Sequence, residues 1–385
     1  MIPEWVGWLV LGTLVLGFAA LAWWLLLSPM PASPQPRNGP RARRTRYIVA
    51  WLVLLSGVLF SAGARWDELW HRTYGGFGDD FLWPPHMLIY GGLALNAGFA
   101  GWGLARTLRG RGGLRERFRA EPLLGLLGLV AAYQMASIPS DLIWHVIIGP
   151  DITAWSLPHV LLAVTTTLVW LAGAGLALSS RSAPRWRLTL SPGLQSLLVI
   201  ALTAIALLAL LQIGVTEWEW PDGDMAAIVQ RPAWSYAVVV LAAGIAQTHM
   251  ALFTTRWIGA ATLTTVLAIA GQLVTALVDR AMLGSGPMLS SYLLVLLPAV
   301  LLDLVHAVSV RRCGVPASRL FGAGVYALTF LASLGAMQAD RVLPPLQPGL
   351  TVPVAVIGVA AALALGPTLS GFATWLSGRQ APVIS

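Results

Sequence analysis

Long apolar segments alternate with short polar segments along the whole chain. Most apolar segments are about twenty residues long, which is the length that a helix needs to cross a hydrocarbon core about 30 Å thick. The pattern predicts an all-α, polytopic bundle of about eleven transmembrane helices. The expected spans are residues 5–27, 47–66, 85–107, 122–145, 156–178, 190–215, 233–254, 257–279, 288–310, 320–338 and 350–375.

The composition agrees with this pattern and excludes several functions. Hydrophobic residues make up 57% of the chain and charged residues 10%, whereas about a quarter of a soluble domain is charged. The one cysteine, Cys313, excludes an internal disulfide framework and a Cys-ligated iron–sulfur cluster. The chain has no Walker loop and no dinucleotide fingerprint, so ATP-driven pumping and nicotinamide chemistry have no support.

Every basic residue is arginine, and the arginines collect in alternate loops. The positive-inside rule then predicts an outer N-terminus and a cytoplasmic C-terminus in a bacterial inner membrane. The net charge of +8 does not indicate nucleic acid, because the arginines lie in short loops between spans. The expected partners are the lipid bilayer, a small apolar substrate or a metal ion, and partner subunits.

The outer loops divide the chain into repeated two-helix hairpins, each joining a span that ends in an acid to one that begins near proline. Residues 1–28 are expected to form an anchor that is kept rather than a removed signal peptide, and residues 29–46 a cytoplasmic Pro/Arg-rich loop. Residues 47–180 are expected to form two hairpins that carry a polar motif. Residues 181–385 are expected to form degenerate hairpins of the same membrane domain.

The polar motif occurs twice. Residues 66–86 read "WDELWHRTYGGFGDDFLWPPH" and residues 140–159 read "SDLIWHVIIGPDITAWSLPH". In each, the Asp and the first His are four residues apart and share one helix face. The second His follows a proline, which suits the first turn of the next helix. The candidate metal ligands are Asp67, His71 and His86 in the first hairpin and Asp141, His145 and His159 in the second.

These six side chains favour a metal site at the outer boundary of the membrane. A carboxylate near the C-terminal end of a helix is disfavoured by about 0.3–1 kcal/mol, and a bound cation would offset this cost. Nitrogen and oxygen ligands without thiolate suit copper, zinc, iron or manganese, and copper is favoured here. The motifs predict one dinuclear site or two mononuclear sites. A hydrogen-bonded structural role and metal-free handling of protons or substrate remain open.

Three further ionisable residues lie in the inner half of the predicted membrane domain. His249 is in one span, and Asp303 precedes His306 by about one turn in another. Ionisable residues inside a membrane are functional candidates. They predict a second inner site or a proton path, beside the simpler alternative of packing residues. A haem between the two histidines is not favoured.

The motif resembles the copper site in the C subunit of particulate methane and ammonia monooxygenases, in which an Asp and two His bind copper within the membrane. The resemblance rests on Asp67, His71 and His86, and again on Asp141, His145 and His159, and it implies copper as the metal. The chain departs from that family in having more spans, two copies of the motif and no cupredoxin-like soluble domain. The hairpin also resembles uncharacterised bacterial multi-pass membrane proteins.

Three functions remain open from the sequence. The first is an integral membrane metal-binding protein with an outward-facing Asp/His site, acting as a copper-dependent oxidoreductase on a lipid-soluble substrate. The second is a metal-ion or proton-coupled transporter, in which the inner residues form a later station on the path. The third is a non-catalytic membrane scaffold.

Overall fold

The computed structural model describes residues 4–28, 40–74, 82, 84–147, 157–179, 193–219, 235–284, 293–339 and 348–376. The secondary-structure elements formed by these residues are helices, and no β-strand occurs among them, so the all-α prediction is confirmed. The chain divides into two compact units, Met1–Ser180 and Arg181–Ser385.

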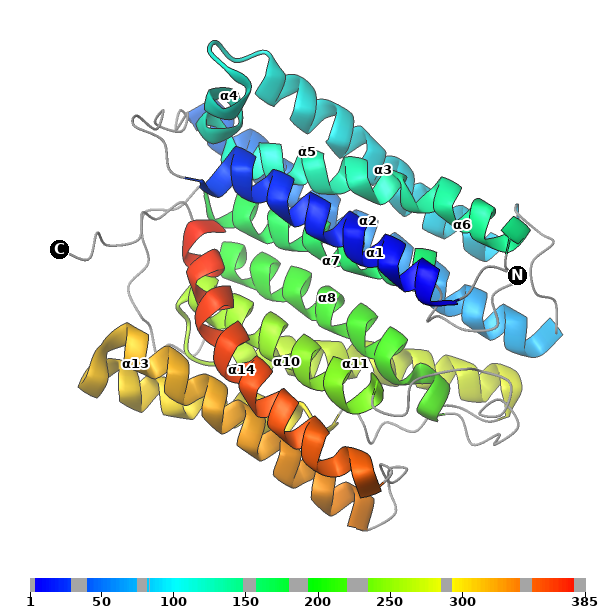
Figure 1. Ribbon diagram of the computed structural model, residues 1–385, viewed down its shortest axis with the longest axis vertical. Helices are drawn as coiled ribbons and strands as arrows, with labels where there is room; N and C mark the ends of the chain where they lie inside the picture. The colour runs from blue at the N-terminus through cyan, green and yellow to red at the C-terminus, as the bar shows by residue number, and fades with distance from the viewer. Residues whose placement is uncertain are drawn as a thin grey trace. The chain divides into compact units, whose positions relative to one another are not determined.

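Unit 1 is a bundle in which α2 and α5 each pack against both α3 and α7. The short helix α4 lies at one end of the bundle, against α3, α5 and η1 (Figure 1). The elements are α1 (Glu4–Ala22), the π-helix η1 (Trp23–Leu27), α2 (Pro40–Tyr74), α3 (Pro84–Leu108), α4 (Leu114–Ala120), α5 (Pro122–Met135), α6 (Ser137–Ile147) and α7 (Leu157–Leu178).

Unit 2 is built around α10, which packs against each of the other four helices described in this unit. In Figure 1, α13 and α14 run side by side. The helices are α8 (Leu194–Glu219), α10 (Ser235–Thr255), α11 (Ala260–Leu283), α13 (Leu296–Ala339) and α14 (Pro348–Leu376).

Helix α13 consists of two arms that fold back on each other. Gly314 has φ 77° and ψ 175°, outside helical values, and Pro316 follows it. Ser309 Oγ donates to Ser318 Oγ over 2.8 Å, and a Cβ on Gly322 would lie 2.7 Å from Cδ1 of Leu302. These pairings are antiparallel, so the two arms correspond to the expected spans 288–310 and 320–338.

Eight helices are long and apolar enough to cross a membrane, and three shorter apolar helices accompany them among the described residues. Each of the eleven expected spans overlaps one of these segments, so the polytopic bundle is confirmed, with eleven an approximate count. The eight longer spans are Arg41–Asp67, Pro84–Leu108, Pro122–Ser140, Pro158–Leu178, Leu194–Gln212, Ala237–Thr255, Ala260–Met282 and Arg312–Ala339. The shorter ones are Gly12–Leu27, Leu296–Val310 and Val352–Ala364.

Two expected elements differ from the structure. Helix α2 begins at Pro40 and ends at Tyr74, so part of the expected loop 29–46 is helical and the helix extends beyond the expected span 47–66 at both ends. Residues 122–145 were predicted as a single helix, but α5 ends at Met135 and α6 begins at Ser137. Pro139 accounts for the break, because a proline inside a helix removes one backbone hydrogen bond and its ring clashes with the carbonyl four residues earlier. The second motif therefore starts on a helix of its own.

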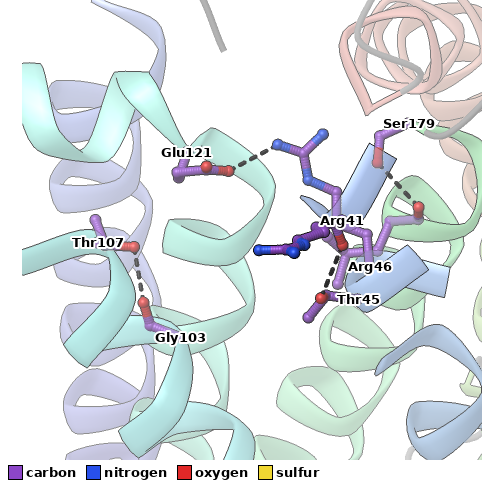
Figure 2. Close-up of polar contacts among 8 residues, drawn as sticks. Arg41, Thr45, Arg46, Gly103, Thr107, Glu121 and Ser179 are labelled. Atoms are coloured by element: carbon purple, nitrogen blue, oxygen red, sulfur yellow. Dashed lines mark hydrogen bonds and ion pairs between the residues drawn. The ribbon is translucent and has the colours of Figure 1, made fainter. Parts of the chain in front are cut away.

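Two polar contacts cross the interior of unit 1. Arg46 Nη2 donates to Oε2 of Glu121 over 2.8 Å, and both side chains are buried (Figure 2). Asn96 Nδ2 donates to Oε1 of Gln134 over 2.8 Å, and Gln134 Nε2 in turn donates to the hydroxyl of Thr166. The bonds from Asn96 to Gln134 and from Gln134 to Thr166 connect α3, α5 and α7 in the interior of the unit.

Candidate functional site

The first motif lies beside a close approach of α2 and α3. A Cβ on Gly63 would lie 2.7 Å from the backbone nitrogen of Ile89, and a Cβ on Gly92 would lie 2.9 Å from the carbonyl oxygen of Ser56. Both distances are shorter than real Cβ contacts allow, so the two glycines let the helix backbones meet. This contact fixes the antiparallel register of the hairpin.

The register brings Asp67 and His86 together. Asp67 follows Gly63 by four residues on α2, and His86 precedes Ile89 by three residues on α3. His86 Nε2 lies 2.9 Å from Asp67 Oδ1, with 25% of the His86 side chain and 22% of the Asp67 side chain exposed. The His86 ring also lies against Tyr90, with 5.8 Å between ring centroids. Two of the three predicted ligands of this hairpin are therefore in contact.

The third residue of the hairpin, His71, lies on the same helix as Asp67. Helix α2 continues without interruption to Tyr74, so the four-residue spacing places the two residues about one turn apart on one face. The position of the His71 side chain lies outside what the structure describes.

The second motif also spans two packed helices, α6 and α7. Asp141 and His145 are four residues apart on α6, and His159 lies in the first turn of α7, half-buried. The side chains of Asp141 and His145 lie outside the described part. Helices α2 and α6 end at the same end of unit 1 (Figure 1), so both motifs belong to that end.

Asp303 binds the beginning of α11. The backbone N–H and the hydroxyl of Thr262 each donate to Asp303 Oδ2 over 2.8 Å. Helix α11 follows Gly259, which has no side chain to serve as a cap. Asp303 therefore supplies from a neighbouring helix the acceptor that an N-terminal Ser, Thr or Asp would give locally.

His306 is engaged elsewhere, between the two arms of α13. Ser309 Oγ donates to Ser318 Oγ, and the same Ser318 oxygen is hydrogen-bonded to Nδ1 of His306, with the donor set by the tautomer of the ring. The ring packs at a steep angle against Phe253, with 4.9 Å between centroids.

The backbone fixes the tautomer of His249. Its Nδ1 lies 2.9 Å from the carbonyl oxygen of Ile245 and must donate to it. The Nε2 lone pair is buried without a hydrogen-bond partner among the described residues, and it faces Gly366, where a Cβ would lie 3.3 Å away. The buried hydroxyl of Tyr326 also lacks a partner there, and the two rings lie 6.4 Å apart.

Among the described residues, no three His, Cys, Asp or Glu side chains form a group that could hold a metal ion. Sequence reasoning did not identify Thr262, Ser309, Ser318 or Tyr326, which contact the inner group or lie beside it. Their signal was weak, because serine, threonine and tyrosine are common in apolar helices. The uncapped start of α11 was the one feature that called for a distant acceptor.

Comparison of the chain with protein-family models, curated proteins and solved structures gives no match. The fold therefore defines the class: a polytopic helical bundle of the membrane-spanning type.

Proposed function

We propose that this chain is an integral membrane metal-binding protein whose α2–α3 hairpin holds copper between Asp67, His71 and His86. The observation that carries the proposal is the distance of 2.9 Å between Asp67 Oδ1 and His86 Nε2. Two ligand atoms that bind one ion at about 2.0 Å, about 90° apart, lie about 2.8 Å from each other. The contact therefore has the spacing of two neighbouring ligands in a tetragonal copper site.

The electrostatics of the hairpin favour a cation beside Asp67. Helix α2 runs seven residues beyond Asp67 to Tyr74, so the helix dipole that was expected to act on Asp67 adds little there. Its ionised carboxylate attracts a neighbouring cation directly. His86 lies in the first turn of α3, at a positive helix end that favours the neutral imidazole. A neutral imidazole and an ionised carboxylate are the forms that bind metal.

Partial burial suits a site that is shielded but reachable. About a quarter of each side chain is exposed, while Oδ1 of Asp67 itself is buried. His71, one turn beyond Asp67, supplies the third ligand in the proposal. Asp141, His145 and His159 form the equivalent set in the second hairpin, either as a separate site or as the other half of a dinuclear one. The proposed face is the non-cytoplasmic one.

The test is element-resolved metal content of the purified full chain after stripping with a chelator and reloading with Cu(II) or Zn(II). We expect about one ion per hairpin, with Asp67→Asn and His86→Ala each lowering affinity about tenfold or more, because each removes a ligand. Glu116→Gln serves as the control, since it removes a carboxylate from the other end of unit 1.

A parent protein that retains less than about a tenth of an ion per chain would overturn the proposal. So would a His86→Ala variant that binds as much metal as the parent. In either case the Asp67–His86 contact is a structural contact between the two helices. The oxidoreductase hypothesis needs a further result, a copper electron-paramagnetic-resonance signal in the parent that a lipid-soluble reductant removes and that is weaker in Asp67→Asn.

A further inference from the structure

We propose that one end of unit 1 binds anionic phospholipid headgroups through six arginines, here named the arginine end. All six side chains are exposed, and their guanidinium groups make no hydrogen bond or ion pair with any described residue. They come from the first turns of α2, from the end of α3 and from the α3–α4 loop. The arginine end consists of Arg41, Arg43, Arg44, Arg106, Arg109 and Arg111.

Internal contacts hold the three segments at the same end of the unit. The Arg46–Glu121 ion pair ties the beginning of α2 to the residue before α5 (Figure 2). Arg117 on α4 donates to the carbonyl oxygens of Leu108 and Gly112, over 3.0 Å and 2.7 Å, which fixes the loop after α3. The six arginines are therefore brought together by the fold rather than only by the sequence.

The carboxylates of this end are already bound within the protein. Glu121 pairs with Arg46, and Glu116 accepts a hydrogen bond over 2.9 Å from the backbone N–H of Gly113. Arg41, Arg43 and Arg44 lie in addition at the start of a helix, where the dipole disfavours a positive charge. The local excess of positive charge calls for an anion from outside.

A second layer of arginines adds to this excess while serving the fold. Arg115 donates to the carbonyl oxygen of Trp24, and Arg119 donates to the hydroxyl of Ser28 over 3.2 Å, so both bind the C-terminal end of η1. Partial burial and the neighbouring Arg115 lower the pKa of Arg119 from its ordinary value. Like charges are thus crowded at this end, which a bound phosphate would relieve.

The depth of the arginine end matches that of lipid headgroups. One membrane-spanning segment begins at Arg41, and another ends at Leu108, two residues after Arg106. Trp23 and Trp24, the first two residues of the helical segment η1, are 56% and 43% exposed, and the guanidinium of Arg115 lies 5.6 Å from the Trp24 ring centroid. Exposed tryptophans at a helix end are typical of the membrane–water interface.

The chemistry of arginine then selects the ligand. The planar guanidinium binds phosphate through two parallel hydrogen bonds, and clusters of four to eight basic residues beside membrane spans are typical of anionic-lipid binding. Phosphatidylglycerol and cardiolipin present such phosphates at this depth and are held there by their acyl chains. A zwitterionic lipid carries a compensating ammonium and is a poorer ligand.

The test is native mass spectrometry of the full chain released from nanodiscs that contain equal amounts of phosphatidylglycerol and phosphatidylcholine. We expect the parent to retain the anionic lipid about tenfold over the zwitterionic one. Two triple variants, Arg41→Gln/Arg43→Gln/Arg44→Gln and Arg106→Gln/Arg109→Gln/Arg111→Gln, should each reduce that preference at least threefold. The control Arg280→Gln/Arg312→Gln removes two exposed arginines from unit 2 and should keep the preference.

Thermal unfolding in detergent checks that the variants are folded and identifies the source of the phosphate. Phosphatidylglycerol should raise the Tm of the parent and of the control, whereas glycerol phosphate at the same concentration should not. Equal retention of both lipids by the parent, an undiminished preference in both triple variants, or equal stabilisation by glycerol phosphate would each overturn the proposal. An acidic protein that competes with the lipid would indicate a protein partner instead.

Discussion

Asp303, on the first arm of α13, accepts two hydrogen bonds of 2.8 Å from Thr262 at the beginning of α11. A helix start without a local cap is thus completed by a carboxylate from a neighbouring helix. The same arrangement gives Asp303 a structural role that is independent of any ion.

Replacing Asp303 should therefore affect stability. Asp303→Ala leaves the first N–H groups of α11 without their acceptor and should lower the free energy of unfolding by about 1–2 kcal/mol. Asp303→Asn keeps one acceptor oxygen and should cost less. Unfolding in a detergent titration measures both. If Asp303→Ala has the same free energy of unfolding as the parent but loses bound metal, Asp303 is a ligand rather than a cap.

The close approach of α2 and α3 gives a prediction with a control next to it in the sequence. Gly92→Ala introduces a Cβ 2.9 Å from the Ser56 carbonyl oxygen, whereas Gly91→Ala meets nothing within 4 Å. The first should destabilise by about 1–3 kcal/mol, and the second should be neutral or slightly stabilising, because alanine favours helix. Equal unfolding curves for the two variants would contradict the tight packing described for the hairpin.

The buried ion pair between α2 and the start of α5 should be costly to break from one side. Glu121→Ala leaves Arg46 buried without its carboxylate, and loss of about 3–5 kcal/mol is expected. Arg46→Met combined with Glu121→Leu removes both charges and should recover most of that loss. A double-mutant cycle measures the coupling between the two side chains. If the losses in free energy of unfolding caused by Arg46→Met alone and by Glu121→Leu alone add up to the loss in the double variant, the two side chains do not couple.

The polar chain through unit 1 should behave similarly on a smaller scale. Gln134→Leu removes both the acceptor of Asn96 and the donor to Thr166, and hydrogen bonds between membrane helices contribute about 0.6–2 kcal/mol. Adding Asn96→Leu should restore part of the loss, because no amide is then left unpaired. A double variant, Gln134→Leu/Asn96→Leu, that is less stable than Gln134→Leu alone would contradict the explanation by an unpaired amide.

The apolar pattern was sufficient for the architecture because a membrane span is defined by a single physical requirement, apolar length. The pattern of apolar lengths also predicted the two arms of α13 as separate spans, because an arginine-rich segment lies between residues 310 and 320. It did not find the break after Met135, where the proline signal at Pro139 lies inside an apolar run.

The partners of polar residues were beyond the sequence because they depend on helix packing. The prediction that the first motif joins two helices in a hairpin required Asp67 and His86 to lie close together, and the structure places them in contact. Asp303 and His306, one turn apart, were predicted to form part of an inner site or a proton path, with packing roles as the alternative. In the structure they contact different neighbours, Thr262 and Ser318 respectively. Adjacent turns of one helix face different neighbours, and only the packing decides which.

The turn between the arms of α13 has a practical consequence. It carries Cys313, the single cysteine of the chain, in an exposed position beside Gly314. A maleimide that is too polar to cross a bilayer will therefore modify this cysteine in intact cells or vesicles only when the turn faces the reagent. Labelling of the natural cysteine thus reports the orientation of the chain in the membrane. Labelling from the cytoplasmic side alone would agree with the orientation predicted from the arginine-rich loops.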